Sequence, residues 1–516
     1  MKKFPIGIQT YKKIINSNYY YVDKTSFIKK LYDKGEYYFL SRPRRFGKSL
    51  FLSTLKAAFS GEKELFQGYF LEHNWDWDIK RPVIHISFGA GVSRSVEDIR
   101  ITFDEILYDH ARKNSIEFVK KSLKGKFAEL ISSLYEKYGQ QVVVLIDEYD
   151  KSILDNIHET ETAILIREEL KNIYSVIKDS DPYLKFVFIT GVSKFSKVSL
   201  FSGLNNLEDI SLAKEYSAIC GYTQEELETV FADRLKGINL DEVRKWYNGY
   251  NWLGEEVYNP FNILLYLNSK EFRNYWFETA TPTFLIKLLE EKKYFIPNIE
   301  NIKASESIIG SFDIDRLEIE TLLFQTGYLT IKDVKKIVTI TQYRLGYPNL
   351  EVKQSLTDYI LYYLTSNTME KENNKFAIFE ALTANDMNKL QKTIHAFFAS
   401  IPNDWYRKNQ IANYEGYYAS IVYCYFASLG LDVVPEDTTN HGQIDLTVHF
   451  DDRIYLIEFK VVELTKKGSA LKQIKDKKYH QKYSNKNVYL IGIEFSRDDR
   501  NIANFEWELI KPSEQI

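Results

Sequence analysis

Features that mark secreted, membrane-spanning and zinc-binding proteins are scarce in this sequence. Its 516 residues include two cysteines, Cys220 and Cys424, which stand far apart and outside the spacing of metal ligands. A zinc site built on cysteines does not fit this pattern, whereas a reducing cytosol does. No apolar run approaches the roughly 20 residues of a membrane helix, and no apolar segment of a signal peptide follows the N-terminal lysines. We therefore expect a cytoplasmic protein that does not partner a membrane.

An excess of charge of one sign is also missing. The chain has 68 Lys and Arg against 71 Asp and Glu, a formal net charge of −3. This balance gives no overall attraction to nucleic acid, so contact with nucleic acid would have to come from a local patch. Internal repeats and low-complexity linkers are absent too, and a chain of this length exceeds one hydrophobic core. Domain boundaries must therefore be inferred from changes in the pattern of apolar residues.

The first part of the chain, to about residue 223, alternates short apolar runs with longer amphipathic stretches. Buried strands that alternate with helices are typical of a mostly parallel sheet covered on both faces. We predict an α/β domain over residues 1–223. Its expected strands are 37–41, 82–88, 142–147, 186–191 and, as a shorter candidate, 207–212.

Two further patterns follow along the chain. Residues 224–377 carry mainly helical runs, beginning with the capping-box signature Thr223 to Glu226, and 327–349 predict a hairpin of the kind that a winged helix contains. Residues 378–516 predict a separate small α/β domain. Its expected elements are a helix at 414–430, strands at 431–437, 442–450 and 453–462, a lysine-rich helix at 469–483 and a strand at 487–496.

The segment SRPRRFGKSL, residues 41–50, lies between an expected strand and an amphipathic helix. In a phosphate-binding loop, backbone N–H groups and a helix N-terminus face the phosphates. Here Gly47 would let the backbone approach, Lys48 would supply charge and Ser49 a metal-binding hydroxyl. Arg42 stands where such a loop usually opens with glycine. A basic surface turn that spells Gly-Lys-Ser by chance is the alternative.

A second element favours the phosphate loop. The apolar run VVVLID ends in Asp147 and continues to Glu148, the arrangement in which one carboxylate meets Mg²⁺ and the next polarises the attacking water. The following strand ends at Thr190, and Ser193 comes soon after. Either hydroxyl could sense a terminal phosphate at this edge of the sheet, although loop polarity alone would also explain them.

These segments resemble the AAA-ATPase-like family of bacterial and archaeal proteins. RPRRFGKSL, IDEYD, ITGVSKF and the opening PIGIQTYKKI…YYVDKTSFIKKLY occur in the order of that family, over roughly residues 4 to 215. The resemblance implies a P-loop NTPase fold of the additional-strand type, ATP and Mg²⁺ as cofactors, and an arginine as normal in this loop. The implied nucleotide-contacting residues are Arg44, Arg45, Phe46, Gly47, Lys48, Ser49, Leu50, Asp147 and Thr190, with Ser49 and Asp147 at the metal and Glu148 in catalysis.

Arg44 and Arg45 leave alternatives open. They could neutralise phosphates, act on the nucleotide of a neighbouring subunit, or form a solvated basic turn. Asp23 and Lys24, earlier in the chain, could pack beside the nucleotide, but a purely structural role is favoured.

The C-terminal part carries a second set of charged residues in apolar strands. Glu458 and Lys460 lie in IYLIEFKVV, and Asp445 lies in the preceding strand, GQIDLTV. An E-x-K triplet alone is common in a charged protein, but buried charges on adjacent strands are costly unless they bind something. A divalent metal held by Asp445, Glu458 and a backbone carbonyl, with Lys460 orienting or activating water, is a usual arrangement for phosphodiester hydrolysis. All-oxygen ligands favour Mg²⁺, and Glu415, at the expected helix start, could complete the site or simply suit the helix dipole.

This arrangement resembles the PD-(D/E)xK nuclease superfamily over about residues 410–500. The matching positions are Glu415, Asp445, Glu458 and Lys460, and Gln473 falls in ALKQIKDKKY, which is similar to the last motif of the subfamily found in AAA-ATPase-like proteins. The proline that usually precedes the first aspartate is absent; it is not a ligand. The following helix is rich in lysine, which would suit contact with the phosphates of a nucleic acid. A face of the helix that is simply exposed to solvent is the alternative. These lysines are Lys472, Lys475, Lys477, Lys478 and Lys482.

Together these sites predict an ATP-binding and ATP-hydrolysing protein whose P-loop domain controls a restriction-endonuclease-like, Mg²⁺-dependent nuclease domain. Nucleic acid is the expected partner, with DNA favoured over RNA, and defence or the processing of mobile elements would suit such an enzyme. A nucleotide-gated binding protein with a catalytically silent nuclease fold is one alternative. A remodelling NTPase that acts in trans is another, and it would require assembly with further copies of the chain.

Overall fold

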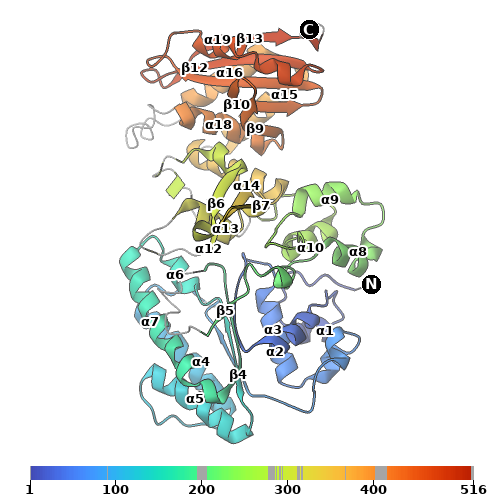
Figure 1. The fold of residues 1–516 in the computed structure, drawn as a ribbon, viewed down its shortest axis with the longest axis vertical. Coiled ribbons are helices and arrows are strands. Elements are labelled where there is room, and N and C mark those ends of the chain that lie inside the picture. The colour runs from blue at the N-terminus through green and yellow to red at the C-terminus, as the bar shows by residue number, and fades with distance from the viewer. Residues whose placement is uncertain are drawn as a thin grey trace. The chain divides into compact units, whose positions relative to one another are not determined.

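The structure is a computed structural model of the chain. It describes residues 2–89, 91–194, 206–276, 285, 288–289, 292, 294–310, 314, 318–365, 368–400 and 415–512. Two compact units are present (Figure 1): the first comprises Met1–Tyr275 and Lys303–Asn349, and the second comprises Trp276–Ile302 and Leu350–Ile516. The finer division into three domains at residues 223 and 377 stays a prediction.

A five-stranded parallel sheet forms the centre of the first unit, with strand order β2-β3-β4-β1-β5. All five expected strands are present, and every residue of VVVLID is buried because helices cover both faces. Figure 1 shows α4, α5 and α7 on one side of this sheet and α1, α2 and α3 on the other. The strands are β1 Tyr37–Ser41, β2 Val83–Ser87, β3 Val142–Asp147, β4 Leu184–Gly191 and β5 Glu208–Asp209. The helices are α1 Tyr11–Asn16, α2 Thr25–Lys34, α3 Lys48–Phe59, α4 Val96–Lys113, α5 Leu123–Tyr138, α6 Lys151–Asp155 and α7 Thr160–Asp179.

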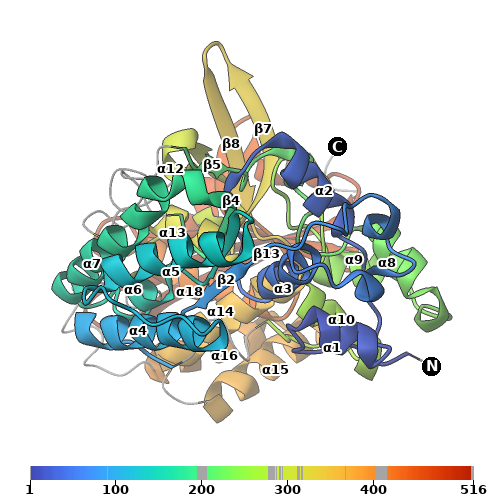
Figure 2. The same ribbon diagram turned by 90° about the horizontal axis from the view of Figure 1, so that it is seen from below.

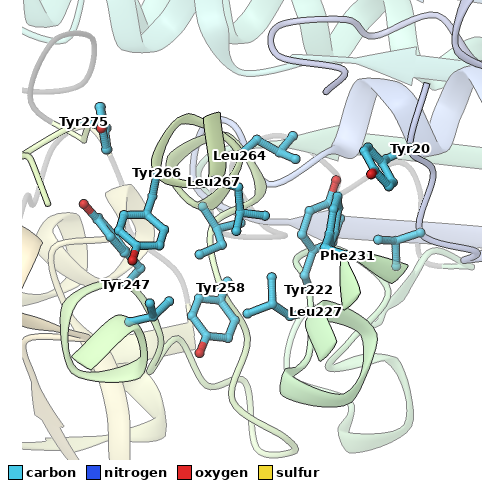
Figure 3. Close-up of a cluster of buried hydrophobic side chains, with 13 residues drawn as sticks. Tyr20, Tyr222, Leu227, Phe231, Tyr247, Tyr258, Leu264, Tyr266, Leu267 and Tyr275 are labelled. Atoms are coloured by element: carbon cyan, nitrogen blue, oxygen red, sulfur yellow. The ribbon is translucent and has the colours of Figure 1, made fainter. Parts of the chain in front are cut away.

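Three helices after the sheet share a core with the N-terminal segment. They are α8 Gln224–Val230, α9 Leu240–Tyr247 and α10 Pro260–Ser269. The predicted capping box at the start of α8 is confirmed: the Thr223 hydroxyl accepts from the Glu226 N–H, and the Glu226 carboxylate accepts from the Thr223 N–H. Tyr20 packs with Tyr222 and Phe231 in a buried aromatic cluster (Figure 3). The first residues of the chain and these helices are therefore one packed body.

A three-stranded sheet completes the first unit. It contains β6 Ile302–Ser305, β7 Thr330–Ile337 and β8 Ile340–Gly346, in the order β6-β8-β7, with α12 Glu306–Gly310 and α13 Ile319–Thr326 between β6 and β7. Strands β7 and β8 pair antiparallel, which confirms the hairpin predicted within residues 327–349.

The second unit is built on a mixed five-stranded sheet, with strand order β13-β12-β11-β10-β9. Only β11 and β12 run parallel, and the helix α19, Ser469–Asp476, lies in the crossover between them. The strands are β9 Asp432–Thr439, β10 Gly442–Phe450, β11 Arg453–Val461, β12 Asn487–Ser496 and β13 Asn501–Ile510. The other helices are α14 Leu350–Thr365, α15 Thr368–Ala384, α16 Met387–Ser400 and α18 Glu415–Ser428.

The sequence did not predict β13. Its residues NIANFEWELI are mostly exposed or half-buried, because β13 is the edge strand and pairs only with β12. An edge strand of this kind lacks the continuous apolar run that reveals a buried strand. The result is an α/β protein with a parallel N-terminal sheet, a helical middle and a small mixed C-terminal sheet, as expected. Across the described ranges, no helix has the length and apolar character needed to cross a membrane.

Candidate functional sites

The phosphate loop in the first unit is folded around its own lysine. Gly47 has a left-handed backbone (φ 96°) and precedes α3, which begins at Lys48 without a side-chain cap. The Lys48 Nζ donates to the carbonyl oxygens of Arg42 (2.8 Å) and Pro43 (2.9 Å). Burial lowers the pKa of Lys48, and the nearby Asp147 opposes that shift. The helix N-terminus and a buried ammonium group therefore meet where an anion would bind.

Arg42 acts as an internal brace for this loop. Its side chain is 1% exposed, and Nη1 donates to the carbonyl oxygens of Ser41 (2.9 Å) and Ser211 (2.7 Å). Nη2 donates to the Tyr216 carbonyl at 3.3 Å, and the guanidinium group lies 4.1 Å from the ring centre of Trp252. The left-handed residues of the loop are Arg45 (φ 68°) and Gly47, not Arg42. Position 42 therefore needs no glycine, because the chain turns elsewhere.

The other loop side chains divide between the core and the surface. The Arg45 guanidinium group lies 3.8 Å from the ring centre of Phe261, and Phe46 is buried against Tyr250 and Trp252. Because their side chains make these contacts, the backbone groups of Arg45 and Phe46 are what remain to contact a nucleotide. That contact stays a prediction. Arg44 is exposed, while Ser49 and Leu50 are half-buried on the first turn of α3.

The predicted acidic residues meet at the ends of β3 and β4. The Thr190 hydroxyl donates to the Asp147 carboxylate at 2.7 Å, and both residues are buried. Burial raises the pKa of Glu148, and the charge of Asp147 adds to this rise. Glu148 has a left-handed backbone (φ 52°), and its carboxylate lies beside Gly89 at the end of β2. These residues and Lys48 thus converge, as the order of the sequence motifs predicted.

Asp150 is a buried carboxylate near Lys48 and Glu148 that the sequence interpretation missed. Its buried carboxylate accepts hydrogen bonds from the N–H groups of Val192 (3.1 Å) and Ser193 (2.6 Å) and from the Ser193 hydroxyl. Ser193 is thereby committed to Asp150, so of the two proposed phosphate sensors Thr190 lies with Asp147 and Ser193 does not. The signal was visible as the final aspartate of IDEYD, but its partners lie 42 and 43 residues further along the chain.

In the second unit, Asp445, Glu458 and Lys460 converge as predicted. Asp445 on β10 accepts from the backbone N–H of Phe459 on β11 at 2.8 Å. The Lys460 Nζ donates to Glu458 Oε1 at 2.9 Å and to Glu415 Oε1 at 3.2 Å. The antiparallel pairing of β10 with β11 brings the first two carboxylates together, and α18 brings the third.

Gln473 completes this group from α19. Its Nε2 donates to Glu458 Oε1, the oxygen that also accepts from Lys460. The other oxygen, Glu458 Oε2, is buried and has no hydrogen-bond partner within the described part of the chain. An unpartnered buried carboxylate oxygen beside a second carboxylate is the donor set that a hard divalent cation uses. The residues therefore fit a metal held by Asp445 and Glu458, although the described residues hold no group of three or more His, Cys, Asp or Glu that could bind one.

Burial sets the protonation of this site. It raises the pKa of Asp445 to about 6 and that of Glu458 to about 7, and for Glu458 the charge of Asp445 adds to the effect. Burial opposes the charge of Lys460, but Glu458 and Glu415 outweigh it and raise the pKa of Lys460 above its ordinary value. Lys460 is therefore a fixed cation at neutral pH and cannot take a proton there.

Gly492 and Glu494, both on β12, place α19 and were not predicted. A Cβ atom on Gly492 would lie 2.4 Å from the Leu471 backbone nitrogen, so only glycine lets the helix approach β12 this closely. The buried Glu494 carboxylate accepts from the N–H groups of Gly468 (2.8 Å) and Ala470 (3.1 Å). This anion holds the start of α19, where the helix dipole favours negative charge. Gln473 reaches Glu458 because these two contacts fix the helix.

The lysine-rich segment is only partly available for phosphates. Lys475 pairs with Glu508 (2.6 Å), and Lys482 pairs with the buried Asp437. Lys472, Lys477 and Lys478 are exposed and form no ion pair in the ranges that the structure describes. Phosphate contact stays a prediction for these three residues.

Replacing Arg42 with glycine should destabilise the first unit and not repair its loop. Arg42→Gly removes charge-assisted hydrogen bonds to buried carbonyls, at a cost of about 2–3 kcal/mol. Arg44→Gly is the matched control, because it adds the same glycine flexibility at an exposed position, where substitutions change stability by about 0.5 kcal/mol. Thermal and urea unfolding of both variants measures the difference. Equal stability of the two variants would contradict the bracing role.

In the absence of metal, the free energy of unfolding should fall as the pH rises through the range in which Asp445 and Glu458 lose their protons. The unfolded chain releases these protons near 4.5 and 3.8, whereas the folded protein holds them to about 7 at Glu458 and about 6 at Asp445. The folded state thus binds more protons between these limits, and its stability falls as they leave. Urea unfolding in EDTA from pH 5 to 8 should show this slope, weakened in Glu458→Gln and retained in the exposed control Glu506→Gln. A slope that Glu458→Gln leaves unchanged would argue against the raised pKa.

Two stretches of the chain match models of known protein families. Residues 5–201 match the family model described as predicted AAA-ATPase, and residues 413–505 match that of the PD-(D/E)XK nuclease superfamily. A protein of Azotobacter chroococcum mcd 1, described as an uncharacterized protein in the vnfD 5′ region, is 52% identical over 507 residues, which cover 98% of each chain. The chain therefore belongs to the AAA-ATPase-like family and carries a C-terminal domain of the PD-(D/E)XK nuclease superfamily.

Proposed function

We propose that this protein is a cytoplasmic, ATP-dependent enzyme in which the AAA-ATPase-like domain regulates Mg²⁺-dependent cleavage of nucleic acid, with DNA favoured over RNA. The observation that carries the nuclease part is the buried, unpartnered Oε2 of Glu458 beside Asp445 and the charged Lys460. Defence against foreign DNA or processing of mobile elements would use such an activity.

The residues of the second unit would divide the work of phosphodiester hydrolysis. A bound divalent cation supplies Lewis-acid polarisation and lowers the pKa of a water molecule. Asp445 and Glu458 would hold it, with Asp445 oriented by the Phe459 N–H and Glu458 oriented by Gln473. Lys460 would place positive charge beside the scissile phosphate and orient the attacking water. In the site without metal, Glu458 and Glu415 raise its pKa and keep it protonated, which suits a cation that orients water.

The residues of the first unit would bind and sense the nucleotide. Lys48 would exchange the carbonyls of Arg42 and Pro43 for phosphate oxygens, since charged acceptors form the stronger hydrogen bonds. Ser49 and Asp147 would hold Mg²⁺, and Glu148 would orient or deprotonate the attacking water. The raised pKa of Glu148 suits a base, because it brings that carboxylate closer to the operating pH.

Cleavage is tested with the full chain, plasmid and linear DNA, and Mg²⁺. Asp445→Ala and Lys460→Ala should each reduce the rate by about a hundredfold or more, the loss typical of removing one electrostatic group from an active site. Lys467→Ala, an exposed lysine of the same unit, is the control and should cut normally. Native rates in both variants would refute the nuclease assignment. DNA binding without metal-dependent cutting by the native protein would instead favour a silent nuclease fold.

Nucleotide control is tested by combining the cleavage assay with Lys48→Ala. This variant should lose binding of a fluorescent ATP analogue by at least about tenfold, because it removes the buried cation of the loop. Its cleavage rate should no longer change on addition of ATP, whereas the native rate should. Lys63→Ala, exposed in the same unit, is the control. If ATP does not alter the native cleavage rate, regulation of cleavage by ATP is refuted. Measuring the size of the protein with and without ATP would then show whether ATP instead causes copies of the chain to assemble.

A further inference from the structure

The hairpin of β7 and β8 extends from the first unit with little packed against it. Figure 2 shows the two strands as a free-standing ribbon that leaves α12 and α13 behind. Nine consecutive residues, 332–340, are exposed, and the pairing continues to Ile337 and Ile340 at the tip. A two-stranded hairpin gains little stability alone in water, so its length requires an explanation other than packing.

The tip of this hairpin is apolar and strained. Ile337 is 48% exposed, Val338 87% and Ile340 63%. Val338 also has a left-handed backbone with φ 55°, which a β-branched side chain rarely adopts. The two-residue turn that joins the strands requires such a backbone, and glycine or asparagine usually supplies it. An exposed apolar side chain held in a costly conformation is therefore a candidate contact point.

The shaft below the tip carries positive charge. Lys335 pairs across the ribbon with Gln342, and Lys336 pairs with Thr341. Arg344 lies opposite Asp333, whose carboxylate accepts from the Val334 N–H. No carboxylate lies within ion-pair distance of Lys335, Lys336 or Arg344 among the described residues. The cations of the shaft suit a partner that carries negative charge on its outer surface. The apolar tip suits stacked apolar rings in the interior of the same partner.

Of the elements around this small sheet, the hairpin is more accessible to a partner than the helix α13. A strand, two helices and a hairpin, with the first strand beside the last, is the connectivity of a winged helix. The second helix of that arrangement, α13, is buried over most of its length, including Thr321 to Gln325. It cannot enter a groove as a recognition helix does. The hairpin, in the position of the wing, has no such obstruction.

We propose that the β7–β8 hairpin is a binding element for duplex DNA, with Lys335, Lys336 and Arg344 on phosphates and the Ile337–Ile340 tip inserted between bases. A two-stranded ribbon fits a DNA groove, and apolar side chains of proteins that kink DNA are used as wedges between base steps. The proposal rests on the nuclease function above for the choice of nucleic acid. It adds a contact outside the nuclease domain, in the other unit of the chain.

The electrostatic part is tested by the salt dependence of DNA binding. Anisotropy of a fluorescein-labelled duplex is measured with the full chain carrying Asp445→Ala, so that nothing is cut. Adding Lys335→Ala and Lys336→Ala should lower the slope of log K against log salt by about 2 and weaken binding about tenfold or more at low salt. The matched control, Lys236→Ala with Lys245→Ala, removes two exposed lysines of the same unit and should change neither.

The apolar tip is tested with Val338→Asn. Asparagine tolerates the left-handed backbone, so the variant should fold at least as stably as the native protein and lose only the wedge. A duplex that contains 2-aminopurine should brighten when native protein unstacks the base, and this increase should be reduced at least about twofold by Val338→Asn.

Unchanged affinity and salt slope in the double lysine variant would overturn the proposal. So would hairpin variants that lose association with another protein while binding DNA normally, since the hairpin would then be a protein-docking element. These outcomes are separate from the nuclease test. A native protein that does not cut, yet binds DNA through the hairpin, refutes the proposed activity alone; one that cuts, with binding indifferent to the hairpin, refutes this inference alone.

Discussion

Both sites depend on charged side chains that are buried beside or within the strands of an apolar sheet. Glu458 is 1% exposed on β11, and Lys48 is buried at the start of α3. Removing such groups from water is costly unless hydrogen bonds and opposite charge offset the loss. In the second unit, Lys460 and Gln473 satisfy one oxygen of Glu458 and leave the other available. In the first, the carbonyls of the loop accept hydrogen bonds from Lys48, and a charged acceptor would form stronger ones in their place. A binding site in this protein is a buried charge whose protein partners are incomplete or replaceable.

The residues that could be predicted are those whose position follows from strand order. Asp445 and Glu458 lie on consecutive antiparallel strands, and Asp147 and Thr190 end neighbouring parallel strands. In each case an apolar run that carries or ends in a polar residue reveals the strand, and the pairing of the strands brings the side chains together. Gln473 could be chosen only through a family resemblance, because its place depends on how closely α19 approaches the sheet. That approach is set by a missing side chain, at Gly492, which no chemical motif marks.

Arg42 shows the other limit of prediction from sequence. Its carbonyl partners at Ser211 and Tyr216 lie 169 and 174 residues away, and Trp252 lies further still. A local motif therefore presents an arginine in the place of glycine and cannot reveal what the guanidinium group contacts. The resemblance implied only that an arginine is normal in this loop. The structure adds the reason: the left-handed turns fall at Arg45 and Gly47, so position 42 is free to brace the loop.

Because Arg42 and Phe46 are fixed in the core, the loop has little freedom to refold around a nucleotide. What can change is the partner of Lys48. If phosphate oxygens accept from this ammonium group, the carbonyls of Arg42 and Pro43 lose their donor, and Asp147 shares the charge of Lys48 with the phosphates. Asp147 is already tied to Thr190 at the end of β4. The nucleotide would thus be registered as an exchange of hydrogen bonds between α3, β3 and β4 and not as a closing of the loop itself.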